Sequence, residues 1–234
     1  MGQAAADPSV NHTTLAIVNG ARGGQDAQAW DATTDANYDT VRLNRLGPLG
    51  LTERQVQIVW VKQADAGPQD SLPSAQSDAY QLESRLGNIA RALRSHYPNL
   101  KIIFFSSRIY AGYATTTLNP EPFAYESGFA VKWLIQAQIE QMSNGGTVTD
   151  ARAGDLNYNS GAVWLALGAV SLGRRHDAPP RRRSGVAEYG FRARWDASVA
   201  ERPTEGRDDG ARVLQNLAVH QMLVRQRRHV PLAP

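Results

Sequence analysis

Residues 56–62 read VQIVWVK, and residues 100–107 read LKIIFFSS. Both runs are short, continuously apolar and rich in β-branched and aromatic residues, which is typical of strands covered on both faces in a parallel sheet. Between them, residues 74–99 (SAQSDAYQLESRLGNIARALRSHYPN) place apolar side chains at helical spacing, and Pro98 marks the end of that pattern. The stretch from 56 to 107 therefore predicts a strand, a helix and a second, parallel strand.

The same alternation continues on both sides of this stretch. TTLAIVN at 13–19 is a third buried strand, which ends at Gly20. Tyr38, Val41 and Leu46 indicate a short helix, and the apolar spacing from about 125 to 142 indicates a longer one. Alternating strands and helices predict a three-layer α/β domain with right-handed crossovers. In such sheets, ligands and catalytic groups gather at the carboxyl ends of the strands.

The composition excludes several classes of protein. The chain has 234 residues and no cysteine, which rules out a disulfide scaffold, a cysteine-ligated metal site and a cysteine nucleophile. No apolar run is long enough to span a bilayer, and residues 1–12 lack the features of a signal peptide. We therefore expect no membrane partner, and nothing in the sequence calls for a metal or another cofactor.

Charge divides the chain near residue 150. Residues 1–150 carry 8 Arg and 3 Lys against 14 acidic residues, whereas residues 151–234 carry 14 Arg and no Lys against 8 acidic residues. An arginine-rich segment such as RRHDAPPRRR (174–183) could neutralise phosphates. However, no aromatic residues alternate with these arginines to stack on bases, so we do not expect a nucleic-acid partner.

Polar motifs follow the first two predicted strands. NGARGGQDAQAW (19–30) places three glycines just after a strand, where backbone N–H groups could hold an oxyanion. The spacing matches neither a dinucleotide nor a P-loop fingerprint, and a plain tight turn is the competing interpretation. KQAD (62–65) ends the second strand and could equally be a solvated strand end.

The third motif is a long loop, SSRIYAGYATTTLNPEPFAYESGFAVKW (106–133). Loops of this length after a buried strand usually bind something. With Asn19, its polar residues are the candidate substrate-binding set: Ser107, Arg108, Tyr110, Glu121 and Glu126. The alternative is that Arg108 and one glutamate form a buried pair that braces the loop.

In this order, the segments LAIVNGARGGQ, QVQIVWVKQA and SSRIYAGYATTTLNPEPFAYESGFAVKWLI resemble a bacterial branch of the SGNH (GDSL-type) hydrolase superfamily. The resemblance covers roughly residues 5–160. It implies a flavodoxin-like, five-stranded parallel sheet in the order 2-1-3-4-5. It also implies a serine esterase that acts on carbohydrate or short acyl esters without a cofactor.

The resemblance assigns only part of a catalytic site. It matches Gly24 to the oxyanion glycine and Gln63 to the Asn or Gln that also binds the oxyanion. The nucleophile block would lie upstream of Met1, since Ser9 follows no strand. None of the five histidines has an acidic residue three positions before it, so the Asp-x-x-His block is absent. We therefore expect a chain with little or no activity.

Residues 186–199 can be encoded by codons that give a different peptide when they are read from the second base. That peptide is W-Q-N-T-D-F-E-P-D-G-T-H-P-S, and it contains the missing Asp-x-x-His block. We therefore expect a reading-frame slip after about residue 165. The predicted organisation is a partial SGNH-like domain at 1–168 and an out-of-frame tail at 169–234, with low order at 174–207 and at most one helix at about 208–226. Without the nucleophile strand, the strands at 13–19 and 56–62 would pair directly or leave an open seam.

Overall fold

A computed structural model describes residues 7–107, 111–112, 115–168 and 219–225. The chain divides into two units, residues 1–173 with 216–234, and residues 174–215. The second unit lies wholly outside the described ranges, as does the segment 174–207 for which we expected low order. The fold described below belongs to the first unit.

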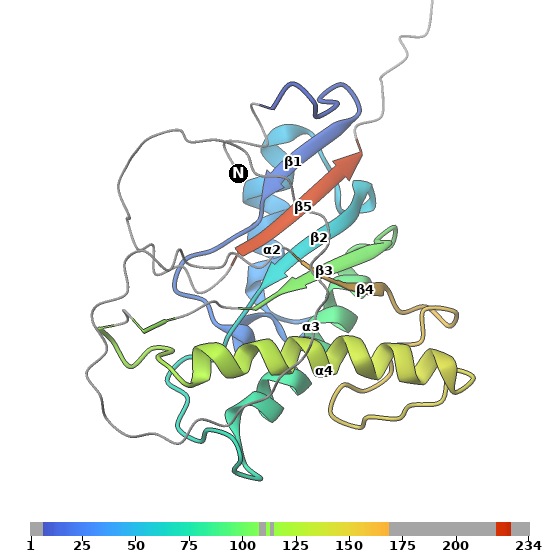
Figure 1. Ribbon diagram of the computed structural model, residues 1–234. Coiled ribbons are helices and arrows are strands. Elements are labelled where there is room, and N and C mark those ends of the chain that lie inside the picture. Colours follow the sequence, from blue (N-terminus) through green and yellow to red (C-terminus); the bar gives the residue numbers. More distant parts are fainter. Residues whose placement is uncertain (1–6, 108–110, 113–114, 169–218, 226–234) are drawn as a thin grey trace, which may run out of the picture. The chain divides into compact units, whose positions relative to one another are not determined.

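A five-stranded sheet forms the centre of this unit. Its strands are β1 (Leu15–Asn19), β2 (Val56–Lys62), β3 (Ile102–Ser106), β4 (Trp164–Leu167) and β5 (Val219–Arg225). Their order across the sheet is β1-β5-β2-β3-β4, which can be followed from top to bottom in Figure 1. The strand nearest the end of the sequence therefore lies between the first two.

The directions of the strands fix which ends meet. β2, β3 and β4 are parallel to one another, whereas β5 is antiparallel to both β1 and β2. Since β1 and β2 both oppose β5, they run in the same direction. The carboxyl ends of β1, β2, β3 and β4 consequently share one edge of the sheet, called here the carboxyl edge, and their first residues share the opposite, amino edge.

In the described residues, three α-helices accompany the sheet. They are α2 (Ala36–Val41), which continues into the π-helical turn Arg42–Leu46, α3 (Asp78–His96) and α4 (Phe123–Ser143). Short 3-10 turns occupy Ala27–Trp30, Gly47–Leu49 and Glu53–Gln55. Ser77 caps α3 by accepting a hydrogen bond from the Ala79 N–H. Because α3 returns from the carboxyl edge to the start of β3, its last turn lies near the amino edge.

One hydrophobic core joins the helices to one face of the sheet. Val59, Val61, Ile103 and Phe105 are fully buried there, together with residues of α2, α3 and α4. Side chains alternate between the two faces of a strand, so the intervening residues lie on the other face. These are Ile58, Trp60, Ile102 and Phe104, and each of them is only partly buried.

The predicted elements between 13 and 143 are confirmed, with boundaries that shift by a few residues. The α/β class is also confirmed, because strands and helices alternate and three strands are parallel. We expected at most one helix at about 208–226; of that stretch the structure describes residues 219–225, which form strand β5 and not a helix. Their backbone pairs on both sides, and two available strand edges outweigh a weak helical spacing. We expected β1 and β2 to pair directly or to leave an open seam. Instead, β5 lies between them and pairs with both.

Candidate functional site

Three of the predicted site residues lie at the carboxyl edge. Asn19 is the last residue of β1, Gln63 follows β2, and Ser107 follows β3. The shared direction of these strands brings together segments that are far apart in the sequence. The residues expected to carry the chemistry therefore share this edge.

The glycine-rich loop is held against the end of β2. Ala27 donates its backbone N–H to the carbonyl oxygen of Ala64 at 3.0 Å. Arg22 Nη1 donates to Asn37 Oδ1 at 2.8 Å, and Asn37 is itself buried. Gly24 has a φ of +73°, and no heavy atom lies within 4 Å of the position a Cβ would occupy. The backbone at Gly24 thus combines a glycine conformation with open space.

Gln63 lies deeper than Gly24. Its side chain is 1% exposed and interacts within the fold. Ser107 is also buried, and its Oγ lies 3.7 Å from the position that a Cβ on Gly128 of α4 would take. The carboxyl edge therefore presents an accessible glycine loop above a closely packed polar layer.

A buried polar cluster occupies that layer and was missed from the sequence. Asp65 Oδ1 accepts a 2.7 Å hydrogen bond from Arg85 Nη1, and Asn119 Nδ2 donates to the Asp65 carbonyl oxygen at 3.1 Å. With Glu126, these residues form the Asp65 cluster. Asp65, Asn119 and Glu126 border a cavity of about 10 Å³, and each has one buried oxygen without a hydrogen-bond partner. The cavity has room for one water molecule.

Burial governs the protonation of this cluster. It raises the pKa of Asp65 above the ordinary value, and the opposing effect of the Arg85 guanidinium is smaller. Burial likewise raises the pKa of Glu126, against a hydrogen bond from the Leu72 N–H. No sequence motif signals this arrangement, because Asp65, Arg85 and Asn119 come from three separate segments.

Both predicted glutamates of the long loop brace the backbone. Glu121 accepts hydrogen bonds from the N–H groups of Ala111, at 2.6 Å, and Tyr125, at 3.0 Å. Glu126 accepts one from Leu72 at 3.1 Å and is 6% exposed. Arg108 and Tyr110 lie outside the described residues. The structure therefore gives the two carboxylates structural contacts, and it does not describe the arginine expected beside them.

The two histidines with described side chains each lie close to a backbone carbonyl oxygen. His96, in the last turn of α3, stacks on Tyr38 with ring centroids 4.1 Å apart, and its Nε2 lies 2.9 Å from the Thr33 carbonyl oxygen. His12 Nε2 lies 3.1 Å from the Asp7 carbonyl oxygen. Neither contact joins a serine to a carboxylate, which is the pairing that a catalytic triad requires.

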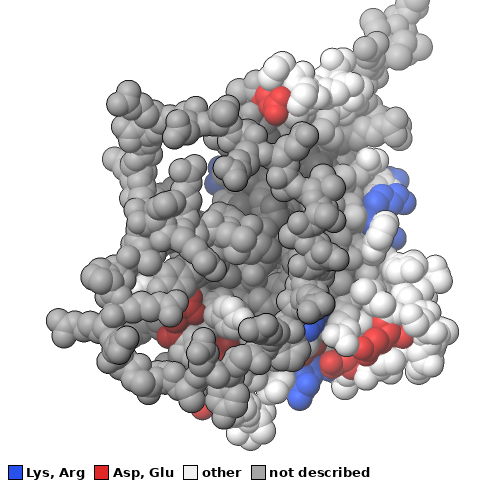
Figure 2. Space-filling view, in the orientation of Figure 1, with Lys and Arg blue, Asp and Glu red and all other residues white. Residues whose placement is uncertain are grey.

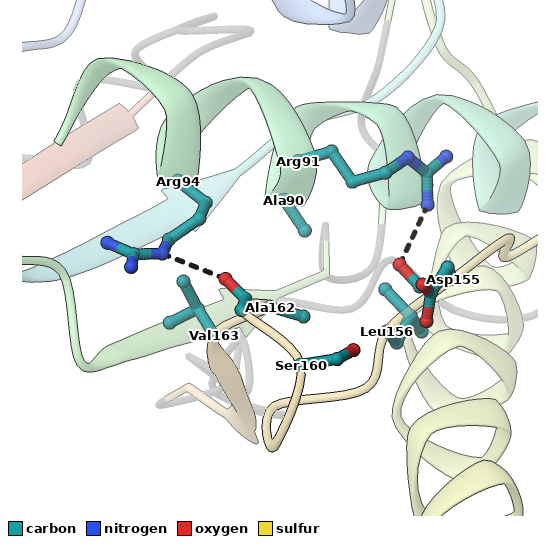
Figure 3. Close-up of a pocket in the computed structure, with 9 residues that line it drawn as sticks. Ala90, Arg91, Arg94, Asp155, Leu156, Ser160, Ala162 and Val163 are labelled. Carbon is teal, nitrogen blue, oxygen red and sulfur yellow. Dashed lines mark hydrogen bonds between the residues drawn. The ribbon is translucent and has the colours of Figure 1, made fainter. Parts of the chain in front are cut away.

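A second hollow lies at the amino edge, where the sequence predicted no site. Figure 3 shows its inner part, between the last turns of α3 and the loop that leads to β4. Arg91 Nη1 donates to the Ala153 carbonyl oxygen at 2.7 Å, and Arg94 Nε donates to the Gly161 carbonyl oxygen at 2.8 Å. The two arginines are three residues apart on α3, so they fix both ends of this loop.

The described residues show neither a metal centre nor a membrane span. No group of three or more His, Cys, Asp or Glu side chains in the described ranges could hold a metal ion. In the same ranges, no helix has the length and apolar character needed to cross a membrane.

On the side shown in Figure 2, blue basic and red acidic atoms of the described part lie close together at the lower right.

Comparison with protein-family models, with curated proteins and with solved structures gave no match. The resemblance described above therefore stands on its three sequence segments alone.

Proposed function

We propose that this chain carries the scaffold of an SGNH-type serine ester hydrolase and is itself inactive. The observation that supports this most strongly is the sheet around the place between β1 and β2. β1, β2, β3 and β4 all run in one direction, and one strand position separates β1 from β2. That arrangement fits the order 2-1-3-4-5, with the nucleophile strand expected in the intervening position.

The strand that occupies that position supports the expectation that the chain is inactive. β5 runs opposite to its neighbours, and its first residue, Val219, pairs with Lys62 at the carboxyl edge. A strand that begins at this edge cannot present a serine at its end there. Attack on an acyl carbon needs a nucleophile beside the oxyanion donors. The Gly24 loop could stabilise an oxyanion, but without a nucleophile no oxyanion forms there.

The alternative is a non-catalytic protein that binds a carbohydrate, or a nucleic acid, through the loop at 106–133 or the arginines of the tail. Residues 108–110, 113–114 and 169–218 are outside the described ranges, and no contact described here favours this alternative. DNA sequence around the gene separates the two proposals. A serine block just upstream of Met1 and a D-G-T-H block in the shifted frame belong only to the esterase.

A comparison of two chains tests the proposal. The chain as it stands should hydrolyse p-nitrophenyl acetate no faster than an inert protein, and a fluorophosphonate should label none of its serines. A chain with the upstream codons and the restored frame should be a serine-dependent esterase. In that chain Gly24→Val should lower kcat/KM by about 10²-fold, as expected when an oxyanion donor is blocked, whereas Gly23→Val should have a smaller effect because no positive φ is disturbed there.

Two results would contradict the proposal. One is stoichiometric fluorophosphonate labelling of a single serine in the present chain. The other is a restored chain that folds but remains inert on acetylated sugars and short acyl esters.

A further inference from the structure

The hollow at the amino edge continues outward into an open groove. The groove has a volume of about 460 Å³ and is bordered by Arg94, Leu100, Lys101, Tyr158, Gly161, Ala162 and Trp164. It shares Arg94, Gly161 and Ala162 with the inner hollow of about 190 Å³ in Figure 3. These seven bordering residues are called here the amino-edge groove. Its size lies within the range of small-molecule sites in proteins.

Two aromatic side chains of the groove are exposed. Trp164, the first residue of β4, is 61% exposed, and Tyr158, in the preceding loop, is 46% exposed. Burying a large aromatic side chain is favourable in free energy, and its ring face stacks well on other rings. Both residues border the same groove, so they offer ring faces to an occupant of it.

The groove is also positively charged. Its seven bordering residues include Arg94 and Lys101 and no acidic residue. Lys101 is exposed, and no hydrogen bond or ion pair joins its ammonium group to a described residue. Arg94 is held in place because its Nε donates to Gly161 and its Nη1 donates to the carbonyl oxygen of Pro98. A guanidinium fixed in this way loses little conformational entropy when an anion binds beside it.

We propose that the amino-edge groove binds a small ligand that combines a ring face able to stack on an aromatic side chain with an anionic group. The ring stacks on Trp164 or Tyr158, and a carboxylate or phosphate pairs with Lys101 and Arg94. Acidic sugars and nucleoside monophosphates both have this chemistry. The site lies at the opposite edge of the sheet from Gly24, so the proposal is independent of the esterase assignment.

Titration of the full chain with four compounds tests this site. Glucuronate and adenosine monophosphate carry the ring and the anion, and methyl glucoside and adenosine are their uncharged counterparts. We expect at least one anion to bind and its neutral counterpart to bind more weakly. Calorimetry gives Kd for each compound, and the compound that binds identifies which source of the shared chemistry the groove accepts.

Two substitutions and a matched control locate the binding. Trp164→Ala and Lys101→Gln should each raise Kd by about tenfold, the change expected when one stacking or charged contact is lost. Lys132→Gln, which removes an exposed lysine of α4 instead, should leave Kd unchanged. Lys101→Gln alters only an exposed side chain and keeps the proposal testable should Trp164→Ala fail to fold. The proposal is overturned if no anion binds, if the neutral compounds bind equally well, or if Lys101→Gln binds like the unmodified chain.

Discussion

Glu83 shows at the scale of one residue how burial sets a pH dependence. It lies in α3, is 1% exposed, and its Oε1 has no hydrogen-bond partner. Burial, reinforced by the neighbouring Asp150 carboxylate, raises the pKa of Glu83 to about 7. The folded state then holds this proton more tightly than the unfolded state does. The free energy of unfolding should therefore fall as the pH rises from 4.5 to about 7.

Glu83→Gln removes this titration. At pH 8 the variant should be more stable than the unmodified chain, by roughly 1–3 kcal/mol, the usual penalty of an unpaired buried group. Urea unfolding at several pH values measures the effect. Glu140→Gln, at an exposed carboxylate of α4, is the control and should keep the original slope. Because burial also raises the pKa of Asp65 and Glu126, a smaller slope should remain in Glu83→Gln. Equal slopes in both variants would contradict the assignment to Glu83.

Gly87 is a second residue whose identity follows from its surroundings. A Cβ at this position of α3 would overlap the carbonyl oxygen of Ala153, which Arg91 holds in place. Gly87→Ala should therefore destabilise the fold by roughly 1–3 kcal/mol, as overpacking does. At Gly128 of α4 the nearest atom is 3.7 Å from the same position, so Gly128→Ala should stabilise the helix by about 0.5–1 kcal/mol. If the melting temperatures of Gly87→Ala and Gly128→Ala shift in the same direction, the space around these two glycines does not decide the effect of the added methyl group.

Single residues also show how far the sequence predicts the site. Asn19, Gln63 and Ser107 lie at strand ends, as predicted, because the end of a strand is visible in the apolar pattern. The contacts of Glu121 and Glu126 with backbone N–H groups were not predicted. Such contacts depend on how a loop folds back on its helix, and neither apolar period nor turn chemistry encodes that.

Among the elements, β5 departs most from the sequence prediction. VHQMLVR has apolar residues compatible with either a helix or a strand, and intrinsic propensity is a weak guide where partners decide. β4 was also missed, because its four residues are too few to show a period. The longer α3 and α4 were predicted well, since several helical turns repeat the same apolar spacing.

A proline in β5 tests its position between two strands. Leu223 pairs with Ile17 of β1 and with Ile58 of β2. Proline cannot donate to a ladder and is excluded from central strands, so Leu223→Pro should cost about 3 kcal/mol or more. Leu223→Ile keeps the backbone N–H and is the control. Thermal unfolding and gel filtration should show a less stable, association-prone chain for the proline variant only. A proline variant that melts like the control would place residues 219–225 outside the sheet.

At the scale of the whole molecule, the two faces of the sheet differ. The sequence predicts strands covered on both faces, and in the described residues the helices join the core on one face only. Ile58, Trp60, Ile102 and Phe104 of the other face remain partly exposed. A continuous apolar run shows that both faces of a strand favour burial. It does not show which segment of the chain packs on each face.

The pairing of β5 also sets a time at which the sheet can be completed during synthesis. Leu15 pairs with Arg225, and β2 pairs with the same late strand. At translation rates of about 5–20 residues per second, β1 waits roughly 10 seconds or longer and β2 roughly 8 seconds or longer before their shared partner exists. Contacts so distant in sequence also form slowly once the chain is complete. During that interval both strands present unpaired backbone groups to whatever is nearby, so the yield of folded protein should depend on holding chaperones and on the rate of translation.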